Sequence, residues 1–207
     1  MAPSSRFHRL PAFLAVLAAA ALGLGWGQTW EEIRSGAGRI QSVQADFVQE
    51  KHMKILAVPL ASAGKLRFRM PDALRWEYTE PFRSVLLLSS GRGRRYIHSG
   101  DGWAEEGAAG IEAMQVVLGE ITHWLNGDFA ANPDFTADLS PDRKITLTPK
   151  SPGLGRIIER IVLDLSATPG IIDAVTIHEG PGSFTRLTFQ APVLNQPIAD
   201  AVFQTVE

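Results

Sequence analysis

The feature that most constrains the fold is a strict alternation of apolar and mostly charged residues between Ala63 and Tyr78. Because successive side chains of a β-strand point to opposite faces, this pattern predicts half-buried strands. Pro71-Asp72 interrupts the alternation where a turn belongs, since proline presets the backbone and cannot donate to a ladder. We therefore expect an antiparallel hairpin with a basic outer face. Its inner face would carry Leu66, Phe68, Met70, Leu74, Trp76 and Tyr78. That face has two interpretations, ordinary sheet core or the lining of a ligand site, and periodicity alone does not separate them.

The rest of the chain predicts more short strands. Ser42–Lys54 alternates with Phe47 on one face, and Val85–Leu88, which includes Leu86, is an apolar run typical of a strand with little exposure. Four later apolar rows lie between turns rich in glycine and proline: Ile145 and Leu147; Ile161, Leu163 and Leu165; Val175 and Ile177; Leu187 and Phe189. A sheet of this many strands must curl. The predicted fold class is mainly β (α+β): a large curled antiparallel sheet that forms a half-open barrel, with short helices over its apolar concave face.

Two helices are predicted to cover that face. Thr29 and Glu32 have the spacing of a capping box at the start of a helix over residues 30–40, which Gly36 and Gly38 weaken. Residues 111–125 have an apolar stripe at three- and four-residue spacing, which includes Leu118 and Ile121. A helix packed on the sheet and a movable lid would show the same stripe.

The first 27 residues are expected to form a cleavable secretory signal. Arg6, His8 and Arg9 precede an apolar stretch over residues 12–24, and small residues follow up to Gly27. An uncleaved membrane anchor is the alternative interpretation, although the stretch is short for a bilayer span. The signal predicts export, to the periplasm in a Gram-negative bacterium, with residues 28–207 as one domain.

The composition points away from several function classes. A net charge of −2 without a dense basic stripe does not favour nucleic-acid binding, and zero cysteines exclude disulfides and thiolate metal sites. The histidines are not spaced as metal ligands, and no nucleophile elbow or dinucleotide fingerprint occurs. We therefore expect no enzyme, no metal and no cofactor.

Residues 91–102 are rich in turn-forming residues and group Arg92, Arg94 and Arg95. A basic cluster of this size is typical of a solvated loop, and a docking role is the alternative.

Several segments together, in their order and spacing, resemble the LolA family of periplasmic carriers of outer-membrane lipoproteins. They are Phe47–Gln49, Gly64–Phe68 with Pro71, Leu74–Tyr78 with Pro81, Leu147–Lys150, Phe184-Thr185 and Asn195–Phe203. The resemblance covers nearly the whole chain after the signal. It implies a half-open barrel with a helical lid, which agrees with the fold expected from periodicity.

The resemblance also implies a function. The cargo would be the acylated N-terminus of a lipoprotein, bound by the ten residues Phe47, Leu66, Phe68, Met70, Leu74, Trp76, Tyr78, Leu86, Leu118 and Ile121. The partners would be an inner-membrane lipoprotein-releasing transporter and an outer-membrane receptor, and the carrier would be a monomer. Two other functions remain open: a carrier of another lipid linked to an exporter, and a lipid-sensing regulator like RseB. The RseB-type regulators share the fold but carry a second domain, for which we expect no room here.

Two features depart from the family pattern. Its best-known members have an arginine before the hairpin proline that helps to hold the lid shut, whereas this chain has Met70. The sequence also stops a few residues after Phe203, where enterobacterial members continue. We therefore expect a divergent branch, with a lid held by apolar packing.

Overall fold

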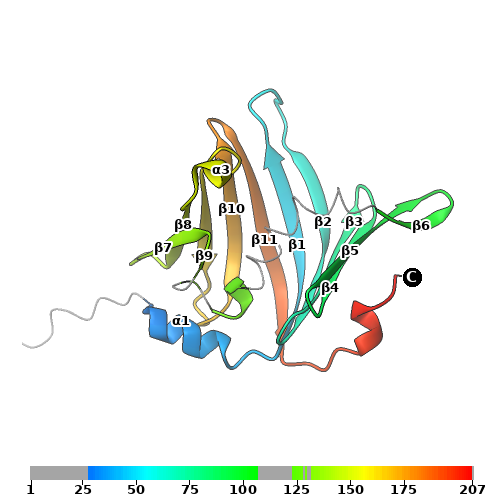
Figure 1. The fold of residues 1–207 in the computed structure, drawn as a ribbon, viewed down its shortest axis with the longest axis horizontal. Coiled ribbons are helices and arrows are strands. Elements are labelled where there is room, and N and C mark those ends of the chain that lie inside the picture. Colours follow the sequence, from blue (N-terminus) through cyan, green and yellow to red (C-terminus); the bar gives the residue numbers. More distant parts are fainter. Residues whose placement is uncertain (1–27, 107–122, 128, 130–131, 207) are drawn as a thin grey trace, which may run out of the picture.

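The computed structural model describes residues 28–106, 123–127, 129 and 132–206. In these residues, eleven strands form one antiparallel sheet with the order β6-β5-β4-β3-β2-β1-β11-β10-β9-β8-β7 (Figure 1). The strands are β1 Ser42–His52, β2 Leu60–Arg69, β3 Ala73–Glu80, β4 Ser84–Ser89, β5 Arg92–Ser99, β6 Gly102–Glu105, β7 Phe135–Ser140, β8 Lys144–Pro149, β9 Arg160–Leu165, β10 Ile172–Gly180 and β11 Ser183–Leu194. The helices are short: α1 Trp30–Ala37, α3 Pro152–Gly155 and the 3₁₀ helix η1 Asp200–Phe203. The mainly β class is confirmed, and the curl into a half-open barrel stays a prediction.

The hairpin predicted from the alternation is confirmed. β2 and β3 pair antiparallel, with Leu66 opposite Trp76 and Phe68 opposite Leu74, and Pro71-Asp72 lies between the strands. The cross-strand pairs stand on one face and belong to the main buried cluster. The sheet therefore has the inner face that the sequence predicts.

One prediction is wrong: residues 91–102 are not a solvated loop. Arg92–Ser99 is strand β5, which pairs with β4 on one side and with β6 on the other. Pairing on both sides satisfies backbone groups that a loop would leave to water, and this tertiary context overrides the local turn composition. Arg94 remains exposed on this strand, while Arg95 is half-buried beside Glu106 at 2.8 Å.

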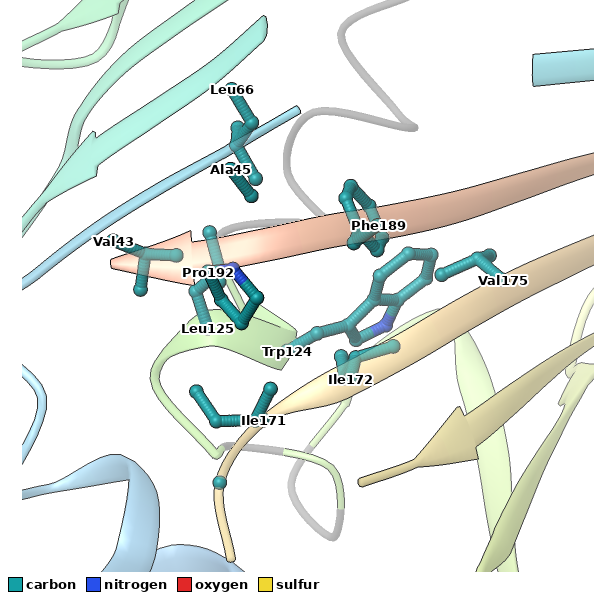
Figure 2. A pocket seen from close by; sticks show the side chains of 11 residues that line it. Val43, Ala45, Leu66, Trp124, Leu125, Ile171, Ile172, Val175, Phe189 and Pro192 are labelled. Atoms are coloured by element: carbon teal, nitrogen blue, oxygen red, sulfur yellow. The ribbon is translucent and has the colours of Figure 1, made fainter. Parts of the chain in front are cut away.

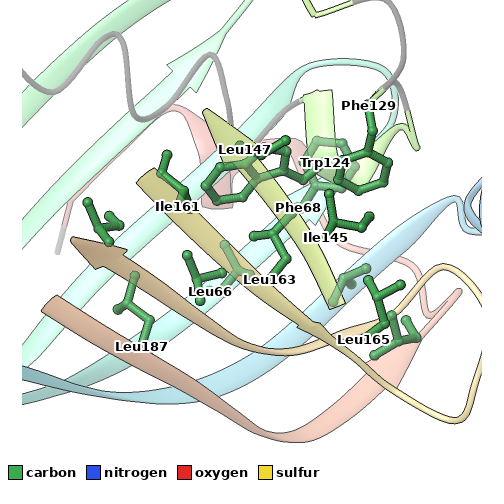
Figure 3. Close-up of a cluster of buried hydrophobic side chains, with 14 of the residues drawn as sticks. Leu66, Phe68, Trp124, Phe129, Ile145, Leu147, Ile161, Leu163, Leu165 and Leu187 are labelled. Atoms are coloured by element: carbon green, nitrogen blue, oxygen red, sulfur yellow. The ribbon is translucent and has the colours of Figure 1, made fainter. Parts of the chain in front are cut away.

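The inner face carries a continuous apolar core. Ile145 of β8 and Leu163 of β9 belong to the same cluster as Leu66 and Phe68 of β2 (Figure 3). Ile33 of α1 joins this cluster. The capping box that starts α1 is present, with Thr29 and Glu32 bonded to each other's backbone amides. The predicted helix is therefore present as α1, which ends at Ala37 and contributes Ile33 to the core, and its cover of the whole inner face stays a prediction.

Glycines allow two close approaches that position these elements. A Cβ on Gly36 of α1 would lie 2.5 Å from the carbonyl of Pro169, so the helix packs directly on the turn between β9 and β10. A Cβ on Gly64 of β2 would lie 2.5 Å from the ring of Phe47, its cross-strand partner. Gly36 thus permits the docking of α1, beyond its expected weakening of the helix, and Gly64 lets the Phe47 ring lie across the neighbouring strand.

The outer face of the hairpin is covered by the C-terminal segment, residues 195–206. Arg75 is only 9% exposed and donates to the carbonyl oxygens of Val202 and Thr205 at 3.1 and 2.8 Å. Arg69 bonds the carbonyl oxygen of Ile198 at 2.9 Å and pairs with Asp200. Ala73, Ile198 and Phe203 form a small second core between the segment and the sheet. The basic outer face predicted from the sequence therefore serves here as an internal contact surface.

Candidate functional site

The predicted site residues that the structure describes all lie on the inner face. Phe47, Leu66, Phe68, Leu74, Trp76 and Leu86 are buried, and Met70 and Tyr78 are half-buried against the same cluster. Leu118 and Ile121 lie outside the described residues, as does most of the predicted 111–125 helix. Its last three residues, 123–125, are helical. The inner-face placement is thus observed for eight residues, and their contact with lipid stays a prediction.

An aromatic group stands at the centre of this face. The rings of Phe47 and Trp76 lie 4.5 Å apart between centroids, and Tyr78 meets Phe47 edge-on at 5.3 Å. Phe189 of β11 meets the Trp76 ring edge-on at 6.2 Å. The Tyr78 hydroxyl donates to Oε1 of Gln49 at 2.8 Å, and burial raises the pKa of the Tyr78 phenol. This group therefore presents a rigid apolar surface whose one polar tip is already satisfied.

A cavity of about 40 Å³ lies between residues 124–125 and the sheet (Figure 2). Its walls come from β1, β2, β10, β11 and the turn before β10, and its lining is almost wholly apolar. The lining residues are Val43, Ala45, Leu66, Trp124, Leu125, Gly170, Ile171, Ile172, Val175, Phe189 and Pro192. No acidic or basic side chain of the described residues lines it.

Among the eight predicted site residues that the structure describes, only Leu66 lines this cavity. Four other lining residues lie in rows that the alternation of the sequence predicts to face inward: Val43, Ala45, Val175 and Phe189. The alternation could therefore have identified them. No pattern in the sequence indicates that residues 171–172 and 192 face the cavity, because this depends on how the ends of the strands are placed in space.

One polar atom in the cavity wall lacks a partner. Trp124 is 3% exposed, and its Nε1 has no hydrogen-bond partner within the described part of the chain. A buried donor left unpaired costs about 1–3 kcal/mol. The Oδ1 of Asn126, two residues further along, is also buried without a partner there. Unpaired polar atoms therefore lie at the end of the 123–125 helix, next to a cavity with an otherwise apolar lining.

The described residues offer no grouping for metal chemistry, since no three His, Asp or Glu side chains gather as ligands among them. Along the same residues, no helix is long and apolar enough to cross a bilayer. The chemistry that the cavity does support is the burial of an apolar group.

The comparisons with known proteins agree with this geometry. The family model described as outer membrane lipoprotein carrier protein LolA matches residues 38–97, which span β1 to β5 and include the hairpin. Over this segment the chain is similar to the LolA family. The LolA family is periplasmic, and its carriers are non-enzymatic. No curated protein matches the chain significantly.

Solved structures resemble the chain at low sequence identity. MucB has a TM-score of 0.50 at 15% identity over 86% of this chain, which spans 62% of MucB. A LolA superfamily protein from Nitrosomonas europaea has a TM-score of 0.40 at 13% identity, covering 86% of this chain and 98% of the other. The lipoprotein LppX of Mycobacterium tuberculosis has a TM-score of 0.43 at 12% identity, covering 82% and 94%. The MucB match supports a shared fold.

Proposed function

We propose that this protein is a LolA-like periplasmic carrier that binds the acyl chains of lipoproteins on its inner face. It takes them from an inner-membrane releasing transporter to an outer-membrane receptor. The observation that carries the proposal is the almost wholly apolar cavity beneath residues 124–125.

Transport through water is the physical problem that such a cavity solves. Each methylene removed from water contributes about 0.8 kcal/mol, so two or three long acyl chains contribute tens of kcal/mol before costs. Loss of the cargo to water is therefore very slow. Release needs a second apolar site that competes for the chains, which is the role of the receptor in this proposal.

The volume of the cavity shows whether acyl chains fit into it in this conformation. A volume of about 40 Å³ holds roughly three water molecules, whereas ligand pockets usually measure about 300–1,000 Å³. Acyl chains therefore enter only if residues 123–125 move away from β10 and β11. With Met70 at the position of the family arginine, closure in this chain rests on apolar packing, in which Trp124 and Leu125 participate.

The unpaired indole nitrogen indicates how the cargo is oriented. The acylated N-terminus of a lipoprotein carries ester and amide carbonyl groups next to its hydrocarbon chains. A carbonyl placed beside Nε1 of Trp124 accepts the hydrogen bond that the protein itself leaves unmade. The hydrocarbon then extends along the apolar face toward Phe47 and Trp76.

Two measurements test the proposal. Protein secreted and purified without detergent should release acylated ligands on extraction, detected by mass spectrometry, and should bind a fluorescent fatty-acid probe. Trp124→Phe keeps an aromatic ring but removes the N–H. It should weaken binding of a diacylated lipopeptide about fivefold while leaving a carbonyl-free hydrocarbon probe unaffected. Trp103→Phe on β6 is the control and should change neither. Protein that is consistently empty and ignores acyl probes would exclude a carrier of any lipid.

The cargo and the partners need a separate assay. Vesicles containing a lipoprotein-releasing transporter should load the protein with lipoprotein, which a receptor should then remove. Loading with free phospholipid or glycolipid alone would favour an exporter-linked lipid carrier. Lipid-dependent binding to an anti-sigma factor would favour a regulator of the RseB type. N-terminal sequencing of the secreted protein should place the cleavage site near Gly27, and size-exclusion chromatography should give a monomer.

A further inference from the structure

Four large apolar side chains are strongly exposed at the tips of three connecting segments. Ile55 and Val58, in the loop between β1 and β2, are 82% and 73% exposed; Phe82, between β3 and β4, is 81% exposed; Ile157, before β9, is 67% exposed. Buried apolar side chains are the rule in a soluble fold, so clustered exceptions of this size indicate an interaction surface. We propose that these residues, the apolar rim, dock on the surface of an anionic phospholipid bilayer.

The topology brings the apolar rim to one edge of the sheet. Neighbouring strands run antiparallel from β3 to β9, so the β1–β2 loop, the β3–β4 turn and the segment before β9 share one end (Figure 1). Five strand spacings of about 4.8 Å separate β3 from β9, or roughly 24 Å along a flat sheet. The three tips thus lie at the same edge of the sheet.

Each tip places a basic residue directly beside its apolar one. Lys54 precedes Ile55, Arg83 follows Phe82, and Arg156 precedes Ile157, and all three basic residues are exposed. Apolar side chains that enter the interface next to cations that contact lipid phosphates are the usual composition of a surface that binds anionic membranes.

Acidic residues also lie at this edge, and two of them pair with basic side chains. Glu179 pairs with Lys51 at 3.1 Å and Glu159 with Arg160 at 2.7 Å, whereas Glu50 lies 4.0 Å from His52, which carries a charge only when protonated. Glu80 and Asp101 are exposed at the same edge without belonging to the tips. Basic residues directly adjoin three of the four apolar ones in sequence, whereas each of these carboxylates lies two or more positions away.

A bilayer fits the geometry of the apolar rim better than a protein partner. The four side chains project from separate tips, so a protein would need separate pockets at matching spacing. A fluid interface accepts all of them at once. α1 packs at the other end of the sheet, against the β9–β10 turn, so the apolar rim lies away from this helix. The inference is independent of the carrier proposal, because docking requires no cargo.

The test is sedimentation of the mature protein with vesicles of phosphatidylcholine, with and without phosphatidylglycerol. We expect binding to the anionic vesicles, weaker binding to neutral ones, and a decrease at high salt. The Ile55→Ser/Phe82→Ser double variant should bind at least about tenfold less tightly, since both side chains lose their burial in lipid. Lys54→Gln and Arg156→Gln should each cost about fivefold.

The control is Val193→Ser, which changes a 46% exposed apolar residue near the end of β11, at the opposite end of the sheet. It should leave vesicle binding unchanged, and all variants should keep the wild-type circular dichroism and acyl-probe binding. Unaltered acyl-probe binding separates this inference from the carrier proposal. Absence of wild-type vesicle binding, including a result in which the edge captures only a protein, overturns the inference. Equal binding by the double variant and the wild type also overturns it.

Discussion

Arg75 holds the C-terminal segment to the sheet, and Arg75→Met tests how much of that attachment depends on the guanidinium. The variant keeps most of the apolar stem but removes the bonds to the carbonyl oxygens of Val202 and Thr205. It also removes the 2.9 Å ion pair with Glu77, which keeps Arg67 as a partner at 3.4 Å.

The magnitude follows from the number and burial of these bonds. Hydrogen bonds from a charged donor contribute about 1.5–3 kcal/mol each, so the two bonds to the segment total about 3 kcal/mol at the low end of that range. We take the low end because the released carbonyls regain water when the segment detaches. A loss of about 3 kcal/mol raises the population of the detached state roughly 100-fold.

Hydrogen exchange measures this detachment directly. The amides of Val202, Gln204 and Thr205 bond carbonyls within the segment at 3.1 Å, so their exchange reports local opening. In Arg75→Met their exchange should accelerate about 100-fold, while amides of β1 and β11 change little.

Arg94→Gln is the matched control, because the exposed Arg94 makes one bond to the segment, to the carbonyl of Gln204 at 3.0 Å. It should accelerate exchange less than about fivefold. Acceleration below about threefold in a correctly folded Arg75→Met protein would refute the argument, since Arg69 and the apolar contacts of Ile198 and Phe203 would then be sufficient to hold the segment.

Three further changes have defined outcomes. Gly36→Ala should lower the free energy of unfolding in urea by about 1–3 kcal/mol, because the Cβ of the new alanine meets the Pro169 carbonyl. This clash should outweigh the better helix propensity of alanine. An increase in the free energy of unfolding would contradict the close packing of α1. Burial, and then Arg160, lower the pKa of His178 below its ordinary 6.5. The unfolded state therefore binds the proton more readily, and the stability of the protein should fall as the pH decreases below 6.5. The urea midpoint of His178→Gln should fall less over this pH range, and a profile identical to that of the wild type would contradict the prediction. Met70→Leu should shift the unfolding midpoint little. Met70→Arg should destabilise the protein by about 2–4 kcal/mol, because it places an unpaired charge against the main buried cluster. Equal midpoints for the two variants would mean that Met70 does not face this core.

Local patterns were sufficient for much of the sheet. The alternation on either side of Pro71-Asp72 predicted β2, β3 and their inner face, because side-chain direction in a strand depends only on the period of two. The capping box at Thr29 predicted the start of α1 for a similar reason, since all of its bonds close within four residues. The carrier interpretation of the inner face came from the family resemblance, which the match to residues 38–97 confirms at the level of the family.

The tertiary structure decided everything that depends on segments distant in sequence. Strand β5 forms in a turn-rich stretch because β4 and β6 supply its hydrogen-bond partners. Arg75 is buried because a segment more than 120 residues later folds over the outer face, a contact that no local period records. The cavity arises from the ends of four strands and residues 124–125 together. A sequence pattern reports which face a side chain takes, whereas burial and cavities depend on what the rest of the chain places against that face.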